Sequence, residues 1–355
     1  MATQRSNFII CTRDVDSRGR FVAEPGETRF LRVPKGARSY DPSHEMRSRE
    51  RWRLAVRAAA DGVEDEITGT TGDVLVFVHG YNNDMNAITW RTEALQTTLQ
   101  AKGWRGVVIA FDWPSDNQTL NYLEDRSDAA EVANRMVGDA IELLVAAQDD
   151  TENPCKINIH LLGHSTGAYV IMEAFNQAQK RGDLYRSHWR VAQVAMIGAD
   201  IASSSLRTDS EWASAMFSRS VRLTNYSNRY DKVLGVSNAK RLGTSPRAGR
   251  VGLPGDAHPK AVNVDCSAYF TTKDPCHSTF DGTFNHSWHI GDPVFALDLA
   301  LTLEGDIDRQ ALPTRERSAD GLVLKAGQRP DFQAGWDAVS PRKARSALSA
   351  AAGGE

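Results

Sequence analysis

The sequence has few cysteines, no long apolar run and almost no excess of charge of either sign. Its four cysteines, at positions 11, 155, 266 and 276, are too few and too scattered for a disulfide scaffold, so free thiols are expected, although Cys266 and Cys276 could pair in an oxidising setting. No apolar run approaches the roughly 18 residues of a membrane span. The first twenty residues lack the apolar core of a secretory signal. These features favour a cytoplasmic protein.

The balance of charge also narrows the class of partner. The chain has 42 basic and 45 acidic residues and a net charge of −3, which leaves no broad basic face for nucleic acid or an anionic membrane. At 355 residues and 41% hydrophobic, it can bury a large core. A small molecule is therefore the expected partner, and nothing in the composition indicates an oligomeric state.

Apolar β-prone runs alternate with helical patterns along the middle of the chain. This alternation predicts a mostly parallel sheet with helices on both faces. Two strands are expected before it, at 7–11 and 28–33, and then a surface helix that follows Pro42 and ends before Gly62. The later expected strands are 73–80, 106–113, 156–162, 190–197, 221–226 and 261–270, and the expected helices are 86–102, one capped by Ser127, 168–182, 209–218 and 292–303.

The pentapeptide from Gly163 to Gly167 reads G-x-S-x-G, a weak signal that its flanks strengthen. A strand-like run, KINIHLL, precedes it, and TGAYVIMEAF follows with apolar residues at helical spacing. A strand, a tight turn and a helix are what a nucleophile elbow requires, because the turn lifts the serine hydroxyl above the edge of the sheet. Ser165 is the predicted nucleophile, and an incidental serine in an ordinary turn is the alternative.

An attacking serine needs donors for the oxyanion that forms on its substrate. The backbone N–H after the nucleophile belongs to Thr166, where the helix dipole adds to the effect. The second donor is expected from the turn after the strand at 73–80, which reads HGYNN, and Tyr81 N–H is the candidate. For His79 the pattern favours a ring that braces this loop over a catalytic base, and His164 is too close in sequence to fold its ring onto Ser165.

Trp113 follows the expected strand at 106–113, at the carboxyl end of the sheet. It is a candidate substrate contact, and a buried tryptophan at a helix-sheet junction is the alternative. Asp112 and Ser115 are expected to organise the same loop.

Three segments, VLVFVHGYNN, FDWPSDNQTLNYLEDRSDA and HLLGHSTGAYV, resemble the α/β-hydrolase fold and, within it, the DUF900 family of bacterial serine hydrolases. The resemblance is firm over residues 73–200 and slight at both ends of the chain. It implies an eight-stranded, mostly parallel sheet and a triad in the order serine, acid, histidine, and it implies no substrate.

The same resemblance implies the other two members of the triad. The segment NHSWHIGDPVF resembles the closing segment of the family, which maps the base onto His286, with His289 as its rival. The acid maps onto Asp231, just past the strand VRLTNY, where it would orient His286 and stabilise the imidazolium. Asp200, after the preceding strand, is the competing acid, and helix capping or loop bracing is its structural alternative.

Six potential metal ligands also fall between positions 266 and 289, namely Cys266, Cys276, His277, Asp281, His286 and His289. Their spacing fits no common zinc pattern, and a C-x-x-C pair is missing. No metal and no organic cofactor is expected.

Together these features predict a catalytic domain over 1–305 and a partly disordered extension over 306–355. Residues 234–260, rich in Gly, Pro, Ser and Arg, are expected to form a long surface loop that could partly cover the site as a lid. The predicted activity is hydrolysis of a small carboxylic ester through an acyl-enzyme. An acyltransferase or thioesterase with the same triad, and a non-catalytic binding protein on the same fold, are the alternatives.

Overall fold

The computed structural model describes residues 6–60, 72–115, 126–141, 158–182, 189–240, 245–273 and 282–331. Within these ranges ten strands form one sheet, in the order β2-β1-β4-β3-β5-β6-β7-β8-β10-β9. The strands are β1 Ser6–Val15, β2 Phe21–Pro34, β3 Asp73–Val78, β4 Gly106–Asp112, β5 Ile159–His164, β6 Val191–Ile197, β7 Ser220–Ser227, β8 Ala261–Asp265, β9 Arg315–Ser318 and β10 Gly321–Leu324.

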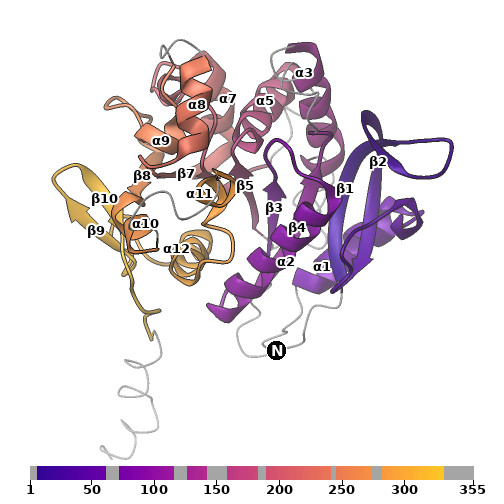
Figure 1. Ribbon diagram of the computed structural model, residues 1–355, viewed down its shortest axis with the longest axis horizontal. Helices are drawn as coiled ribbons and strands as arrows, with labels where there is room; N and C mark the ends of the chain where they lie inside the picture. The colour runs from indigo at the N-terminus through magenta and orange to yellow at the C-terminus, as the bar shows by residue number, and fades with distance from the viewer. Residues whose placement is uncertain are drawn as a thin grey trace, which may run out of the picture.

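The sheet is parallel from β1 to β10, and only its outermost strands are antiparallel. β2 pairs antiparallel with β1, and β9 pairs antiparallel with β10. Figure 1 shows these two hairpins at opposite ends of the sheet. The mostly parallel α/β architecture is confirmed, but the predicted count of eight strands is wrong, because two short strands after residue 305, β9 and β10, extend the sheet.

Helices cover both faces of the sheet, as predicted. They are α1 Arg49–Ala60, α2 Met85–Ala101, α3 Arg126–Arg135, α5 Gly167–Lys180, α7 Glu211–Arg219, α8 Lys232–Lys240, α9 Ala248–Val251, α10 Ser267–Lys273, α11 Gly282–Ser287 and α12 Pro293–Glu304, with 3-10 turns η1 Pro42–His44 and η3 Ser203–Leu206.

The two faces of β3 show how the core is divided. Val74, Val76 and Val78 pack in the cluster that holds the apolar side chains of α1, α5 and α7. Leu75 and Phe77 point to the other face and pack with side chains of α2, α10 and α12. Because successive side chains of a strand point to opposite faces, an apolar run buries both sides only when helices cover both.

The helix expected after Ser127 differs in two respects. α3 begins at Arg126, so Ser127 lies inside the helix and does not precede it as an N-cap. After Arg135 the chain continues as a π-helical segment, η2, over Met136–Ile141. The rest of the predicted helix lies outside the described residues.

The segment 234–260 is less of a surface loop than its composition predicts. It contributes to α8, contains α9, and buries Leu234, Arg247 and Ala248. α9 packs against the central part of the sheet, where Asn225 Nδ2 of β7 donates to Ala248 O at 2.9 Å. Its described parts therefore include residues packed on the sheet, next to exposed ones such as Val236 and Val251.

The predicted extension after residue 305 likewise begins inside the fold. Arg315 on β9 is fully buried and forms an ion pair with Asp298 of α12, with Nη2 and Oδ1 2.6 Å apart. Thr314 Oγ1 donates to the same carboxylate at 2.6 Å. The folded unit therefore reaches at least β10, and residues 332–355 lie outside the described part.

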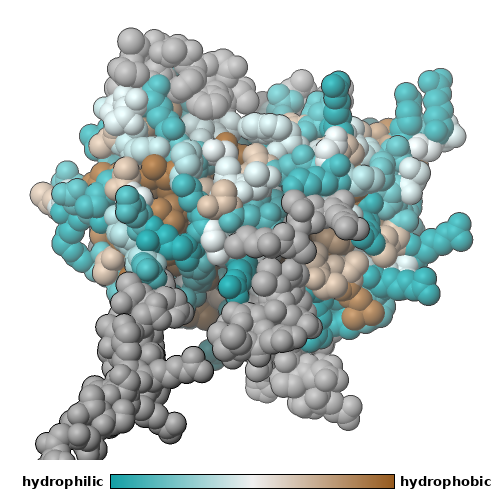
Figure 2. Space-filling view, turned by 90° about the horizontal axis from the view of Figure 1, so that it is seen from below, coloured by the Kyte–Doolittle hydropathy of each residue, from teal (hydrophilic) through white to brown (hydrophobic). Residues whose placement is uncertain are grey.

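In the space-filling view from below, hydrophilic residues cover most of the described surface, and apolar residues occur in small separate groups (Figure 2). No helix in the described ranges has both the length and the apolar content needed to cross a bilayer.

Candidate active site

Ser165 lies in the two-residue turn between β5 and α5, with a backbone φ of +57°. A left-handed conformation costs a residue with a side chain about 1–2 kcal/mol. Three backbone hydrogen bonds hold it in place. Its N–H donates to Ile197 O at 3.0 Å, and its carbonyl oxygen accepts from Ala168 N–H and Asp200 N–H, both at 3.1 Å. This strained strand-to-helix turn has the local geometry of a nucleophile elbow.

Two glycines allow the backbone to approach closely around the turn. A Cβ atom on Gly167 would lie 2.1 Å from Val78 O, so any side chain there would separate α5 from β3. A Cβ on Gly80 would lie 2.7 Å from Ser165 Cβ. The loop after β3 therefore lies directly against the serine.

Asp231 and His286 form a buried pair, with Asp231 Oδ2 2.6 Å from His286 Nδ1. Asp231 stands between β7 and α8, and its other oxygen, Oδ1, accepts from Leu234 N–H at 2.9 Å in the first turn of α8. The carboxylate is thus held at a helix N-terminus, where the helix dipole favours a negative charge.

The other two candidates for these roles have different partners. Asp200 Oδ1 lies 3.1 Å from Arg247 Nε and accepts from Ser237 Oγ at 2.9 Å. His289 is fully buried, and neither of its ring nitrogens has a hydrogen-bond partner. Burial, followed by the nearby His286, lowers the pKa of His289 to about 3.

The His286 ring packs close to the serine turn. A Cβ on Gly198, the residue after Ile197, would lie 2.9 Å from His286 Cε1. His286 Nε2 is buried and has no hydrogen-bond partner, so the expected bond between it and Ser165 Oγ is not made in this structure. Hydrogen bonds between nucleophile and base are often long without substrate and tighten when it binds.

His164, the residue before the serine, lies against His286. The two ring centroids are 4.7 Å apart, and His164 Nε2 lies 3.3 Å from the backbone oxygen of His286. Burial and then the neighbouring His286 hold the pKa of His164 well below its usual range. A neutral ring can donate its Nε2 proton to that carbonyl, which is a supporting contact for the backbone of His286.

The two predicted backbone donors come from the serine turn itself and from the loop after β3. Thr166 is the N-cap of α5, where the first-turn N–H groups have no acceptor within the helix. Tyr81 lies in the loop between β3 and α2, next to Asn82, which has a φ of +54°. The loop is fastened to the residues after β4, since Asn82 N–H donates to Ser115 O at 2.6 Å.

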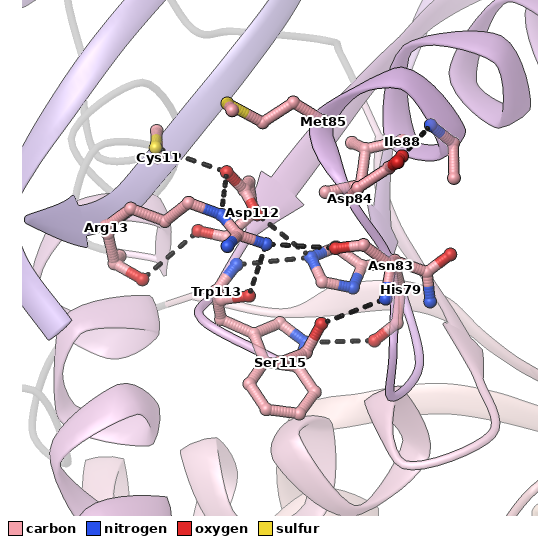
Figure 3. A network of polar contacts seen from close by, with 12 residues as sticks. Cys11, Arg13, His79, Asn83, Asp84, Met85, Ile88, Asp112, Trp113 and Ser115 are labelled. Carbon is pink, nitrogen blue, oxygen red and sulfur yellow. Dashed lines mark hydrogen bonds and ion pairs between the residues drawn. The ribbon is translucent and has the colours of Figure 1, made fainter. Parts of the chain in front are cut away.

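His79 and Trp113 are packed together beneath this loop (Figure 3). The rings are stacked with centroids 5.5 Å apart, and Trp113 Nε1 donates to His79 O at 2.9 Å. His79 Nδ1 lies 2.8 Å from Gly80 O, which fits the predicted bracing role. Trp113 is completely buried, so the alternative of a junction tryptophan fits it better than the predicted substrate contact.

Arg13, a buried charged residue that was not among the sequence-predicted site residues, also contacts this loop. Arg13, near the end of β1, lies 3.0 Å from both carboxylate oxygens of Asp112 and donates through Nη2 to Asn83 O at 3.0 Å (Figure 3). The only signal in the sequence is a basic residue two positions after the expected strand at 7–11, and its partners are about 70 and 100 positions away.

Of the six potential metal ligands between 266 and 289, the described residues include Cys266, His286 and His289. No group of three or more metal-ligating side chains occurs in the described part of the chain. Cys266 is a buried free thiol there. The other three members lie outside the described residues.

A mostly parallel sheet with a serine elbow after β5 and a His-Asp pair at the same edge defines an α/β-hydrolase. The chain belongs to the family described as "Alpha/beta hydrolase of unknown function (DUF900)", whose model matches residues 57–251, more than half of the 355 residues. No curated protein matches the chain.

Several solved structures are similar to this chain. A dienelactone hydrolase from Anabaena variabilis is 16% identical, covering 74% of this chain and 88% of its own, with a TM-score of 0.33. An esterase from the archaeon Pyrobaculum calidifontis is 13% identical, covering 66% and 76%, with a TM-score of 0.35. Carboxyl esterase 2 from Tuber melanosporum is 8% identical, covering 85% and 89%, with a TM-score of 0.37.

Proposed function

We propose that the protein is a serine hydrolase that cleaves carboxylic esters through an acyl-enzyme, with Ser165 as nucleophile, His286 as base and Asp231 as the orienting acid. The observation that carries the proposal is the strained φ of Ser165 together with a buried Asp231-His286 pair whose ring packs against Gly198, beside the serine. Strain of this kind is maintained where the surrounding bonds over-determine it, and it clusters at active sites.

In the proposed reaction, His286 Nε2 accepts the proton of Ser165 as the hydroxyl oxygen attacks the ester carbonyl. Asp231 holds Nδ1–H of the imidazole, which fixes the tautomer with its free lone pair on Nε2 and then stabilises the imidazolium. The unpartnered Nε2 supports this assignment, because a buried nitrogen with no other acceptor or donor is available for the serine. His286 next protonates the departing alcohol, and water attacks the acyl-enzyme to release the acid.

The developing oxyanion would accept from Tyr81 N–H and Thr166 N–H. Thr166 is the N-cap of α5, so the dipole of a 14-residue helix points its positive end at the developing charge. Losing one such donor typically lowers kcat by about 10²–10³-fold. No metal is needed in this route, because the charge is stabilised by backbone amides.

The test is labelling with a fluorophosphonate probe, followed by mapping of the modified residue. The proposal predicts modification of Ser165 in the wild-type protein and none in a Ser165→Ala variant of unchanged thermal stability. A series of p-nitrophenyl esters of increasing chain length then gives the acyl preference. A folded wild-type protein that neither reacts with the probe nor hydrolyses any of these esters contradicts the proposal. Transfer of the acyl group to an added alcohol would identify an acyltransferase.

A further inference from the structure

We propose that Arg13, on β1 and outside the residues matched by the family model, is a positioning residue that holds the 79–83 loop so that Tyr81 N–H faces the oxyanion. This proposal rests on the proposed function, since it assigns Arg13 a role in the same reaction. The contacts described for Arg13 are with Asp112, Asn83 and Trp113, so it acts through the loop.

The first step of the argument is that Arg13 joins three segments with a single side chain. Its Nε donates to Asp112 at the end of β4, and its Nη2 donates to Asn83 O at 3.0 Å and to Trp113 O at 3.4 Å. The planar guanidinium presents its donors in a fixed fork, so the three acceptors are held in one relative geometry. The loop after β3 is thereby tied to β1 and to the end of β4 (Figure 3).

The second step is that the charges are buried and balanced. Arg13 is 3% exposed and Asp112 is 0% exposed. Burial raises the pKa of Asp112, but Arg13 and then His79 more than offset it and bring the pKa to about 2. Burial alone would lower the pKa of Arg13, yet the carboxylate raises it above its usual value. Both groups therefore keep their charges, and the fork keeps its donors.

The third step is that the clamp acts on the segment that carries the proposed donor. Tyr81 lies between His79, which Trp113 holds at its backbone oxygen and ring, and Asn83, which Arg13 holds at its backbone oxygen. Asn83 Nδ2 in turn donates to Gly80 O at 2.8 Å and Tyr81 O at 3.0 Å. The carbonyl oxygens of both peptide groups around Tyr81 therefore accept from Asn83, whose own backbone oxygen accepts from Arg13.

The chain contains a matched control for this network. Arg315 and Asp298 form a second buried Arg-Asp pair, with Arg315 Nε 2.9 Å from Asp298 Oδ2. In each pair a tyrosine hydroxyl also donates to the carboxylate at 2.7 Å, from Tyr40 to Asp112 and from Tyr226 to Asp298. The second pair lies between α12 and β9 and has no described contact with the 79–83 loop.

The experiment compares two charge-balanced double variants of the full chain, Arg13→Met with Asp112→Asn, and Arg315→Met with Asp298→Asn. Removing both partners leaves no unpaired buried charge, so both variants are expected to fold. Displacing a catalytic group by about 1 Å can cost roughly 100-fold in rate. The first variant should therefore lose about 100-fold in kcat with KM within about twofold of wild type, and the second should keep its kcat.

A second readout separates positioning from loss of stability. A trifluoromethyl ketone forms a tetrahedral adduct on the serine, and its affinity follows stabilisation of the oxyanion. The Arg13 double variant should lose ketone affinity by the same factor as kcat, at a temperature where circular dichroism shows both variants folded. Arg13→Lys keeps the charge but loses the planar guanidinium donors, and its kcat should fall by at least about tenfold. This single variant tests the proposal even if the double variant misfolds.

The outcomes are distinct. Equal kcat values for the two double variants, or a change in KM alone, overturns the role of Arg13, as does a Lys variant with wild-type kcat. A wild-type protein that is neither labelled at Ser165 nor active on esters overturns the proposed function, and the Arg13 proposal falls with it.

Discussion

His286 Nδ1 and Asp231 Oδ2 lie 2.6 Å apart, although 55 residues separate them in the chain. α8, α9, β8 and α10 lie between them in the chain, and the pair forms because the turn after β7 and the residues of α11 meet at the same edge of the sheet. α8 and α11 are in direct contact there, and Lys232 N–H donates to Asn285 Oδ1 at 2.8 Å. The acid is thus fixed by its own helix cap and by the segment that carries the histidine.

Asp231→Asn tests the acid. Asn keeps an oxygen for Leu234 N–H, so the cap and the fold should survive, but the amide no longer holds the imidazole in the required tautomer. We expect kcat to fall by about 10³–10⁴-fold with little change in KM. Steady-state kinetics on a p-nitrophenyl ester measures both values.

Asp200→Asn is the matched control, because Asp200 also follows a strand of the sheet and was the competing acid. Its carboxylate contacts Arg247 and Ser237, and no contact links it to His286. The variant should keep a kcat close to wild type. A larger loss in Asp200→Asn than in Asp231→Asn would exchange their roles.

Local sequence features indicate the elbow, but only the family resemblance favoured Asp231 over Asp200 as the acid. Ser165 is marked by local features, a strand-like run, two glycines and a helical pattern within about 20 residues. Asp200 and Asp231 look alike locally, since each follows an apolar strand. Which one meets His286 depends on the path of the chain through α8 and α11, which is a tertiary feature without a local signal. Arg13 has the same limitation, because its partners are far along the chain.

Ser165→Gly and Ser165→Ala should differ in stability because of the positive φ. The left-handed conformation costs an alanine about 1–2 kcal/mol and costs a glycine almost nothing. The larger entropy of glycine in the unfolded state offsets part of this advantage. We expect the Gly variant to be more stable than the Ala variant by about 0.5–1 kcal/mol, with both inactive. Urea denaturation measures the difference.

The same two substitutions at Ser214 serve as the control. Ser214 is exposed inside α7, where backbone dihedrals are helical. There Ala should be more stable than Gly by about 1 kcal/mol, which is the opposite order. An identical order at both positions would show that the backbone at Ser165 is not strained.

Stability should fall with acid partly because of His289. Its folded pKa is about 3, so below pH 6.5 the unfolded chain binds a proton that the folded chain does not. The free energy of unfolding therefore rises with pH between about 3 and 6.5, and this histidine contributes about 1.4 kcal/mol per pH unit to that rise. His289→Phe should reduce the slope of unfolding free energy against pH by about one proton in that window.

Above pH 7.5 the difference between wild type and His289→Phe should not change with pH, because the histidine is neutral in both states. The variant should also keep ester hydrolysis, since His289 has no carboxylate partner. Loss of activity in His289→Phe with normal activity in His286→Phe would make His289 the base.

The end of the sheet formed by β9 and β10 was the least predictable part of the fold. β9 reads RERS, which is charged and only four residues long, and β10 adds four more. Neither has the length or apolar pattern that marks a strand by itself. They join the sheet through pairing of β10 with β8 and through the buried contact of Arg315 with Asp298, and both require the folded core to be present.

Arg315→Met tests whether this C-terminal hairpin is an integral part of the fold. The substitution leaves the Asp298 carboxylate buried without its cation, which should cost about 3–5 kcal/mol. Adding Asp298→Asn removes the unpaired charge and should recover most of the loss. Tyr226 and Thr314 donate to different carboxylate oxygens, so in the variant one hydroxyl can still donate to the amide oxygen and the other can accept from the amide NH2. Urea denaturation of the single and double variants measures the coupling. A surface ion pair contributes less than about 1 kcal/mol to stability. If Arg315→Met alone changes the unfolding free energy by less than that, the hairpin is an appendage and the catalytic domain ends near Gly305.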